Sequence, residues 1–397
     1  MPWTAPQGAG ATVFIWSGYS LAERDRRWKA AREAGASAGF DCLLVPLGNG
    51  IDGRYLTQLR CSAMVLPSDG RDPIVIADRS SRNEWVPDPW QTGREWAEPM
   101  GEALLDLRME RARIGVVGLE RGGVTHVSSI DGVVNHTAFS EVLKKLPNAK
   151  FEDATDLVGF VRFVKSAEEL AYVRRSAEVA AAGLDELTKL AKPDVDAAVL
   201  YASVIEKLLE LRSEYFPLSL SIDPIDAARP RVYKNPPIGK RLVKNALITS
   251  EVNAILGAQL TQVCQPIVLG AVPDKYKPVI EAQREVYETG LSQLRDGNTF
   301  GNLTDVVHRL GRKHNLKAVA QLHGCGYGDD GPLLTANGLS EWVRNLRIEK
   351  GNAFVWKPTV ITDDETIQFC WGGPVIVAAN DAEPLFKRSH GVVSIDS

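Results

Sequence analysis

Residues 160–184, FVRFVKSAEELAYVRRSAEVAAAGL, decide how this chain of 397 residues is organised. Ser166 and Glu169 have the spacing of a capping box, in which both side chains satisfy free backbone N–H groups at the start of a helix. Apolar residues then recur at helical spacing on one face, namely Leu170, Val173, Ala177, Ala180, Leu184 and Leu187. The stretch predicts a long amphipathic helix that begins after Ser166 and packs one face against a core.

On the N-terminal side of this helix, short apolar runs alternate with helical segments. We expect helices at Leu21–Ala36, Trp96–Leu107 and Thr137–Leu146, and short strands at Phe40–Val45, Arg54–Gln58, Ala63–Leu66, Pro73–Ala77 and Arg113–Val117. Residues 151–165 are expected to form the joint between two parts of the chain. Strands that alternate with helices are typical of an α/β domain, which we predict here.

On the C-terminal side, helices and strands are grouped. We expect helices at Pro193–Leu211, Lys275–Leu294 and Leu303–His314, and strands at Leu218–Ile222, Ala246–Leu256, Gln262–Leu269, Ala353–Val360, Thr366–Cys370 and Val375–Ala379. Helices that flank a C-terminal sheet indicate an α+β arrangement for this half.

Composition and charge exclude several classes of protein. Hydrophobic residues make up 44% and charged residues 24% of the chain, as in ordinary globular proteins, and the net charge is −4. A slightly acidic chain without a basic tract is not expected to bind nucleic acid. No apolar run reaches the ~18 residues that a membrane span needs, and the first residues do not resemble a secretory signal. Five scattered cysteines suit reduced thiols, so we expect a cytoplasmic protein.

The segment Gln321–Leu334, QLHGCGYGDDGPLL, is the first candidate for a functional site. It places one histidine, His323, among glycines that let the backbone approach another group closely. A histidine in such a position can bind a metal or transfer protons near neutral pH. Cys325, in the same segment, and Cys370 lack a pattern for a thiol nucleophile, so we interpret both as buried cysteines.

A series of motifs resembles the creatinase/aminopeptidase P superfamily, which has the pita-bread fold. The motifs follow in the order and approximate spacing of that family: RYLTQL at 54–59, the helix at 160–184, ARPRVY at 228–233, ALITSEVNAILGAQLTQVCQPIVLG at 246–270, LHGCGYG at 322–328, FVWKP at 354–358 and WGGPVIV at 371–377. The resemblance implies an α+β pita-bread catalytic domain over residues 161–397, preceded by a smaller α/β creatinase-type domain over residues 1–160. It also implies a homodimer.

The resemblance places the five metal-binding positions of the family's peptidases in this sequence, where four residues differ. Glu251 and Gln262 stand where the family has two aspartates, and His323 is retained. Lys357 replaces the glutamate of a Glu-Pro motif, and Gly372 replaces the last glutamate. In addition, Arg231 stands where the family has a proton-shuttling histidine.

These replacements change the chemistry that we expect. Hard divalent metals need several anionic oxygens, and a lysine within a few Å would repel a cation by roughly 4 kcal/mol per charge pair at intermediate dielectric. We therefore expect no metal and no cofactor, with Lys357 forming a salt bridge to Glu251 in the pocket. The chain is in this respect similar to the metal-free branch of the superfamily, which includes creatinase and ectoine hydrolase and cleaves C–N bonds in small molecules.

The resemblance also suggests roles for the remaining candidates. His323 would be the general acid or base, and Glu251 would hold Lys357 or orient water. Lys357 would either lose its proton and act as a base or stay charged and bind an oxyanion; the sequence leaves both open. Substrate contacts are expected from the following side chains: Arg231 as a carboxylate clamp, Gln262, Trp371 in space left by Gly372, Asp330, and Arg54 of the N-terminal domain.

Four functions remain open from the sequence. The first is metal-independent hydrolysis of a C–N bond, of amide or amidine type, in a small carboxylate-bearing molecule, because Arg231 and Lys357 are both positive. The second is a lyase or decarboxylase acting on a small acid, possibly aromatic, in the same pocket. The third is an Xaa-Pro metallopeptidase with unusual ligands, and the fourth is an inactive binding protein with this fold. The expected partner is an anionic small molecule, with neither nucleic acid nor membrane.

Overall fold

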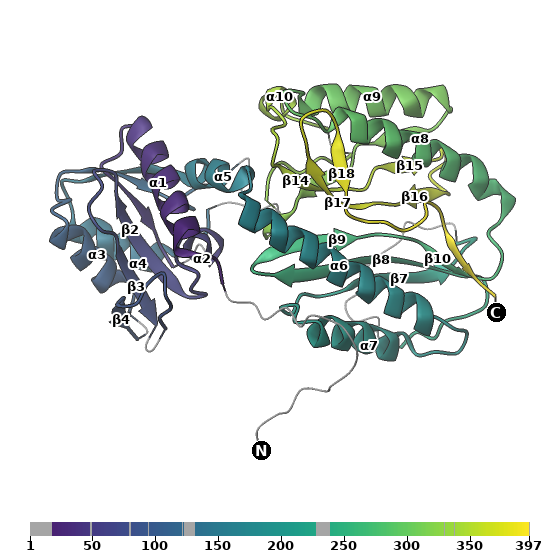
Figure 1. The fold of residues 1–397 in the computed structure, drawn as a ribbon, viewed down its shortest axis with the longest axis horizontal. Coiled ribbons are helices and arrows are strands. Elements are labelled where there is room, and N and C mark those ends of the chain that lie inside the picture. The colour runs from purple at the N-terminus through teal and green to yellow at the C-terminus, as the bar shows by residue number, and fades with distance from the viewer. Residues whose placement is uncertain are drawn as a thin grey trace, which may run out of the picture.

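The computed structural model describes residues 18–47, 50–78, 81–93, 95–120, 122, 132–227, 239–328, 330–336 and 338–396. In Figure 1 the chain forms two lobes, with α1–α5 and β1–β6 in one lobe and the elements from α6 onward in the other. The two lobes meet at α5, Thr155–Phe163, and the start of α6, Ala167–Leu190.

The N-terminal lobe contains one six-stranded sheet in the order β4-β3-β2-β1-β5-β6. Its strands are β1 Cys42–Val45, β2 Ser62–Pro67, β3 Ile74–Asp78, β4 Trp90–Thr92, β5 Arg113–Val116 and β6 Lys150–Asp153, and its helices are α1 Leu21–Ser37, α2 Gly50–Thr57, α3 Ala97–Asp106 and α4 His136–Lys145. The sheet is mixed, because β1 is antiparallel to β2 and parallel to β5. This arrangement agrees with the predicted α/β domain.

One prediction for this lobe is wrong. The segment Arg54–Gln58 lies in helix α2 and its end and not in a strand, and the Thr57 hydroxyl donates to the carbonyl oxygen of Gly53, one turn back, at 2.7 Å. Residues 151–165, the expected joint, hold the end of β6 and all of α5, where the two lobes meet (Figure 1). Five residues are too few for the apolar pattern to distinguish a helix from a strand. The expected domain boundary at 160 and 161 falls inside α5 and stays a prediction.

Helix α6 begins as predicted. Ser166 accepts a hydrogen bond from the backbone N–H of Glu169 at 3.2 Å, and the Glu169 carboxylate accepts one from the N–H of Ser166 at 2.9 Å. The stripe of Val173, Ala177, Ala180, Leu184 and Leu187 is buried. The helix packs against α7, Ala197–Glu210, and against β8 and β9, so this stripe supports the sheet that carries the candidate site.

The C-terminal lobe holds three sheets between two pairs of helices. In Figure 1, α6 and α7 lie on one side of the sheets, and α8, Lys277–Gln293, and α9, Phe300–Lys313, lie on the other. The other elements are β7 Ser219–Pro224, β8 Ala246–Leu256, β9 Gln259–Val263, β10 Ile267–Leu269, the 3-10 helix η1 Asp274–Tyr276, β11 Lys317–Val319, β12 Leu322–Gly324, β13 Gly326–Tyr327, α10 Glu341–Asn345, β14 Ala353–Trp356, β15 Thr359–Ile361, β16 Gln368–Cys370, β17 Gly373–Val377, β18 Ala382–Pro384 and β19 Val393–Ile395.

The pairing of these strands brings distant segments together. One sheet has the order β13-β9-β8-β10-β19, with β7 beside β8; a second has the order β12-β14-β17-β18; a third has the order β11-β15-β16. Two predicted strands are interrupted. The first, 353–360, breaks at Lys357 and Pro358, and the second, 262–269, breaks at residues 264–266. The first interruption matters most, because it lies at a candidate site residue.

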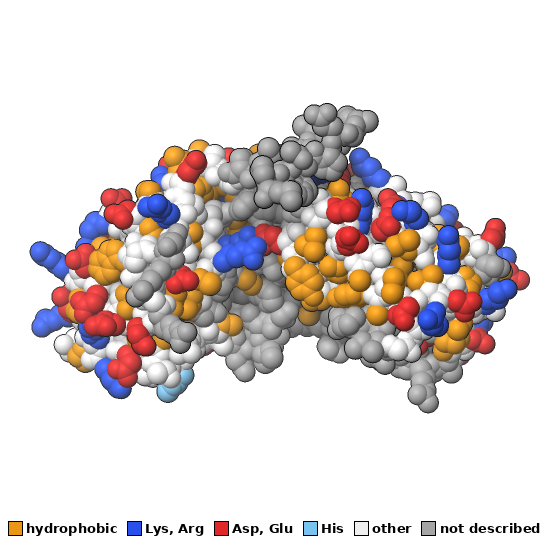
Figure 2. Space-filling view, turned by 90° about the horizontal axis from the view of Figure 1, so that it is seen from below, with side chains coloured by type: hydrophobic (Ala, Val, Ile, Leu, Met, Phe, Trp, Pro, Cys, Tyr) orange, Lys and Arg blue, Asp and Glu red, His pale blue; other side chains and the backbone are white. Residues whose placement is uncertain are grey.

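Charged side chains of both signs are visible on the surface. On the face in Figure 2, positive and negative side chains are interspersed over both lobes. Among the helices that the structure describes, none combines the length and the apolar character required to cross a membrane.

Candidate functional site

Lys357 lies at the centre of the candidate site. Strand β14 ends at Trp356, and Pro358 follows Lys357, so the chain breaks between β14 and β15 at this point. The Lys357 ammonium donates to Glu251 Oε1 at 2.7 Å and to Gln262 Oε1. Its side chain is 3% exposed, whereas that of Glu251 is 23% exposed. The contact between Lys357 and Glu251 that the sequence suggested is therefore present, with the open side at the carboxylate.

The hairpin of β8 and β9 supplies both partners of Lys357, Glu251 and Gln262. Asn253 is paired with Gln262 across the hairpin, and Glu251 lies two residues before Asn253, on the same face of β8. The Asn253 side-chain amide donates to the backbone oxygens of Pro217 and Glu251, both at 3.2 Å. These acceptors fix the orientation of Asn253, whose Oδ1 accepts from Gln262 Nε2 at 3.0 Å. Gln262 Oε1 must then face the site.

His323 contacts the same oxygen from a different sheet. It lies on β12 opposite Val355 of β14 and is 6% exposed. Its Nε2 is 3.3 Å from Gln262 Oε1, and because that oxygen can only accept, Nε2 is the protonated nitrogen in this contact. Nδ1 lies 3.2 Å from the carbonyl oxygen of Gly324. The site thus joins a histidine, an amide, a carboxylate and an ammonium through one chain of hydrogen bonds.

The charge state of Lys357 follows from two opposing effects. Burial lowers the pKa of the lysine, because an ammonium loses its hydration in the protein interior. The adjacent Glu251 carboxylate favours the charged form, and the pKa is raised on balance. Lys357 is therefore a fixed cation at neutral pH. This environment favours oxyanion binding, which the sequence left open beside the role of a base.

This set of side chains does not fit a pair of divalent metals. It offers one carboxylate, one amide oxygen and one imidazole, and the Lys357 ammonium already binds the carboxylate and the amide oxygens. A second cation within a few Å would be repelled by Lys357 and would find too few anionic ligands. Among the described residues, no three His, Cys, Asp or Glu side chains form a cluster able to hold a metal.

Gly372 corrects one expectation. We expected the missing side chain to leave space for substrate beside Trp371. Instead, the Gly372 backbone pairs with Cys264 through two hydrogen bonds, at 2.9 and 3.1 Å. A Cβ atom at position 372 would overlap the carbonyl oxygen of Trp356 and lie 2.8 Å from Lys357 Cα. The glycine therefore allows a close approach of two backbone segments, and it does not open a cavity.

Trp371 belongs to an aromatic cluster next to the site. Its ring centroid lies 4.6 Å from that of Tyr287, 4.7 Å from His390 and 5.3 Å from Phe386. The indole is 4% exposed. This packing gives Trp371 a structural role in the described arrangement, and the expected contact with substrate stays a prediction.

Two further candidates are engaged elsewhere. The Asp330 oxygens contact Arg162, Lys165 at 3.1 Å and the backbone N–H of Tyr327 at 3.0 Å, in a fully buried position. Arg54 forms a two-pronged ion pair with Glu214, at 2.5 and 2.9 Å, across the two lobes. The structure therefore favours structural roles for both side chains. Arg231 lies outside the described residues, and its expected role as a carboxylate clamp stays a prediction.

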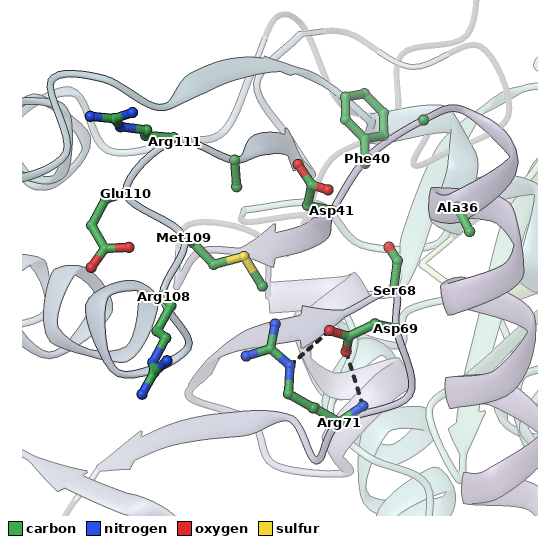
Figure 3. A pocket seen from close by; sticks show the side chains of 12 residues that line it. Ala36, Phe40, Asp41, Ser68, Asp69, Arg71, Arg108, Met109, Glu110 and Arg111 are labelled. Atoms are coloured by element: carbon green, nitrogen blue, oxygen red, sulfur yellow. Dashed lines mark hydrogen bonds and ion pairs between the residues drawn. The ribbon is translucent and has the colours of Figure 1, made fainter.

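A separate hollow of about 800 Å³ lies in the N-terminal lobe (Figure 3). It is bordered by the end of α1, the start of β1, the end of β2 and the turn after α3. Its charged side chains offset one another; for example, Arg71 binds Asp69 at 2.8 Å and the carbonyl oxygen of Leu107 at 2.8 Å. None of the residues predicted from the sequence lines this hollow, so it is not the candidate active site.

Sequence reasoning did not identify Asn253, which sets the orientation of Gln262. The signal was available in part. Glu251 and Asn253 are polar residues at alternate positions in the strand Ala246–Leu256, and such a pair faces the same side of a sheet. The sequence did not show that Asn253 would lie opposite Gln262, because this depends on the register of the hairpin.

Comparison with known proteins places this site in a family. The model of metallopeptidase family M24 matches residues 171–379, more than half of the chain. The chain belongs to this family of hydrolases and therefore to the creatinase/aminopeptidase P superfamily with the pita-bread fold.

Individual relatives give the extent of the similarity. The uncharacterized hydrolase/peptidase y4tM of Sinorhizobium fredii is 26% identical over 195 residues, and the alignment spans about half of each chain, 49% of this one and 48% of y4tM. The uncharacterized hydrolase/peptidase y4tL of the same organism is 22% identical over 330 residues, covering 78% of this chain and 80% of y4tL.

Solved structures support the fold over both lobes. An Xaa-Pro dipeptidase from Bacillus anthracis has a TM-score of 0.77 at 15% identity, covering 94% of this chain and all of that chain. An X-Pro aminopeptidase from Thermotoga maritima has a TM-score of 0.76 at 14% identity, covering 93% and 99%. At this level of identity the similarity establishes the shared fold and leaves the reaction open.

Proposed function

We propose that this protein is a metal-independent hydrolase that cleaves a C–N bond, of amide or amidine type, in a small molecule. The observation that carries the proposal is the position of Lys357. Its ammonium binds the Glu251 and Gln262 oxygens at the positions where the family's peptidases bind metal. A fixed cation in that place can stabilise negative charge that develops on substrate without a metal.

The contacts suggest one role for each side chain. Within the described part of the chain, two acceptors lie within hydrogen-bonding distance of Lys357 Nζ, which leaves its third N–H for an oxyanion. Glu251 Oε2 has no partner among the described residues, and Glu251 is the most exposed of the four site residues. We assign Glu251 to orient water and accept its proton, and His323 to protonate the leaving nitrogen.

The proposed hydrolysis has two steps, the attack of water and the release of the nitrogen. Water attacks the carbon of the C–N bond while Glu251 takes a proton, and the electron pair of the C=O or C=N bond moves to the heteroatom beside Lys357. Collapse of this intermediate breaks the C–N bond, and the nitrogen leaves with a proton from His323. The proton on Glu251 and the proton lost by His323 are then exchanged through solvent, which restores both side chains. Glu251 already balances the charge of Lys357, so Lys357 is not free to bind a carboxylate on the substrate. Binding of such a carboxylate depends on the expected clamp, Arg231, which lies outside the described residues.

An Xaa-Pro metallopeptidase is the second candidate. It is favoured by the similar solved structures, which include an Xaa-Pro dipeptidase and an X-Pro aminopeptidase, and by the retained His323. The two candidates differ in their need for metal, so one experiment can separate them.

The test uses full-length protein treated with a chelator and a matched sample supplied with Mn²⁺, Zn²⁺ or Co²⁺. Both samples are incubated in heavy-oxygen water with small N-acyl and N-amidino acids and with Xaa-Pro dipeptides. We expect the chelated protein to cleave a member of the first group and to place one labelled oxygen in the product. Cleavage of Xaa-Pro dipeptides only in the metal-supplied sample would overturn the proposal. Turnover without label would indicate the lyase or decarboxylase.

A further inference from the structure

The two cysteines nearest to the candidate site lie side by side. Cys264 follows β9 two residues after Gln262, and Cys370 ends β16. Their sulfur atoms are 3.9 Å apart although the residues are 106 positions apart in the chain. The backbone explains this proximity, because Cys264 pairs with Gly372, two residues after Cys370, through two hydrogen bonds.

The same pair contacts the backbone of the central lysine. The Cys370 thiol lies 3.4 Å from the carbonyl oxygen of Lys357, to which it can donate a hydrogen bond. Cys264 is buried and Cys370 is partly exposed, so Cys370 is the more accessible residue of the pair. Of the remaining cysteines, Cys61 is exposed and Cys42 and Cys325 are buried.

We propose that Cys264 and Cys370 form a reversible disulfide when the protein meets hydrogen peroxide, and that this bond alters the position of Lys357. The two sulfur atoms, 3.9 Å apart, would have to approach to the ~2.05 Å of a disulfide. The new bond removes the Cys370 thiol hydrogen and with it the hydrogen bond to the Lys357 carbonyl oxygen. The proposal concerns the thiols and does not depend on the reaction proposed for the site.

The order of the two steps follows from the environments of the thiols. Cys264 donates toward Cys370, and this contact, assisted by the nearby Lys357 ammonium, lowers the pKa of Cys370. The same contact together with burial raises the pKa of Cys264. Because a thiolate is the reactive form, Cys370 is oxidised first and Cys264 reacts second.

The chemistry requires peroxide as the only oxidant. The Cys370 sulfur attacks one peroxide oxygen, the S–O bond forms, the O–O bond breaks, and the leaving oxygen departs as water, which gives a sulfenic acid. The Cys264 sulfur then attacks the Cys370 sulfur, the S–S bond forms, the S–O bond breaks, and a second water leaves. Two electrons pass from the two sulfurs to one peroxide, and a dithiol reductant restores both thiols.

The test treats reduced wild-type protein with one equivalent of peroxide, blocks the free thiols by alkylation and maps the peptides by mass spectrometry. We expect one intramolecular Cys264–Cys370 disulfide that a dithiol reverses, with Cys61, Cys42 and Cys325 still alkylated after unfolding. Cys264→Ser should instead accumulate a Cys370 sulfenic acid that dimedone traps. Cys325→Ser is the matched control and should behave as wild type.

Two results would overturn the proposal. The first is oxidation of Cys61 before Cys370, with intermolecular disulfides as the product. The second is a Cys264–Cys370 disulfide that leaves hydrogen–deuterium exchange unchanged in the peptides that contain Gln262 and Lys357. We expect exchange in those peptides to increase in oxidised wild type and to stay unchanged in peroxide-treated Cys264→Ser.

Discussion

Two groups of charged side chains in this protein look alike in composition and differ in their exposure to solvent. The site cluster consists of Glu251, Asn253, Gln262, His323 and Lys357. The junction cluster, between the lobes, consists of Arg27, Asp52, Arg162, Lys165, Glu169 and Asp330. In both clusters, buried cations are in direct contact with carboxylates. Burial and pairing alone therefore do not distinguish a functional site from a structural one.

The charged residues of the junction cluster are buried together. The Arg27 guanidinium lies over the rings of Tyr55 and Tyr19 at 4.1 and 4.3 Å and donates to Tyr327 Oη at 3.0 Å. Arg162 binds Asp52 at 2.8 Å and Asp330. All six charged residues of the cluster are 6% exposed or less. Such an arrangement connects the two lobes.

The site cluster differs at its Glu251 end. Glu251 is partly exposed and one of its oxygens has no partner among the described residues, and Lys357 retains one N–H. The difference indicates where function lies: unused hydrogen-bonding capacity that faces an opening identifies the site better than the number of charges does. The substitutions below test this distinction, from the largest expected effect to the smallest.

Arg162→Met should cause the largest loss of stability. It removes the guanidinium that binds the buried Asp52 and Asp330, while Lys165 still binds Asp330, and breaking a buried ion pair from one side costs about 3–5 kcal/mol. Urea unfolding of the full-length protein measures the loss. Arg175→Met is the control, since its pair with Glu178 is exposed and should contribute less than about 1 kcal/mol. Equal losses in the two variants would show that the junction cluster does not hold the lobes together.

His323→Ala tests the site cluster and should reduce activity strongly while changing stability little. Loss of a general acid should lower turnover of the substrate found in the panel by about 10²–10⁴-fold. The melting temperature should change little, because the contacts of Lys357 with Glu251 and Gln262 do not involve His323 and remain in the variant. Added imidazole should restore part of the turnover in His323→Ala. Equal losses of fold and activity, without rescue, would assign His323 to structure.

The difference between the clusters also explains how much the sequence could predict. Glu169 and Ser166 are three residues apart, so the capping box is visible in the sequence, and the resemblance carried the Lys357–Glu251 pair over 106 positions. By contrast, Arg27 and Tyr327 are 300 residues apart, and no short-range pattern or family motif connects them. Asp330 was taken for a substrate contact because its partner, Arg162, could not be recognised from sequence.

Backbone proximity was equally invisible in the sequence. Gly372 was interpreted as a lost side chain, whereas the structure requires glycine because two backbone segments meet there. The break at Lys357 was hidden in an apolar run, since Pro358 after a strand predicts an end but not the direction in which Lys357 points. Both features depend on how β9, β14 and β16 meet in space.

Protonation of His390, which lies beside the site, should have a smaller effect, namely a loss of stability at low pH. Burial lowers the pKa of His390 to about 4, and its Nδ1 has no partner among the described residues. The unfolded chain, with an ordinary histidine pKa of about 6.5, binds more protons than the folded chain between these values. Stability should therefore be full above pH 6.5 and should fall as the pH drops toward 4. If this histidine is the cause, the urea concentration at the midpoint of unfolding should vary less between pH 4.5 and 7 in His390→Gln than in wild type.

Lys357→Glu should have the smallest effect, because it should hardly change the amount of metal that the protein binds. The change restores one carboxylate of the family's set, but Gln262 still replaces an aspartate and Gly372 cannot carry a side chain without moving the Trp356 backbone. Two carboxylates at positions 251 and 357 would instead repel each other, so the protein should melt at a lower temperature than Lys357→Gln. Elemental analysis after dialysis against Mn²⁺ or Zn²⁺ should give well below one equivalent in both variants. Two equivalents in Lys357→Glu would mean that a single lysine keeps the metals out, and that the rest of the cluster still forms a metallopeptidase site.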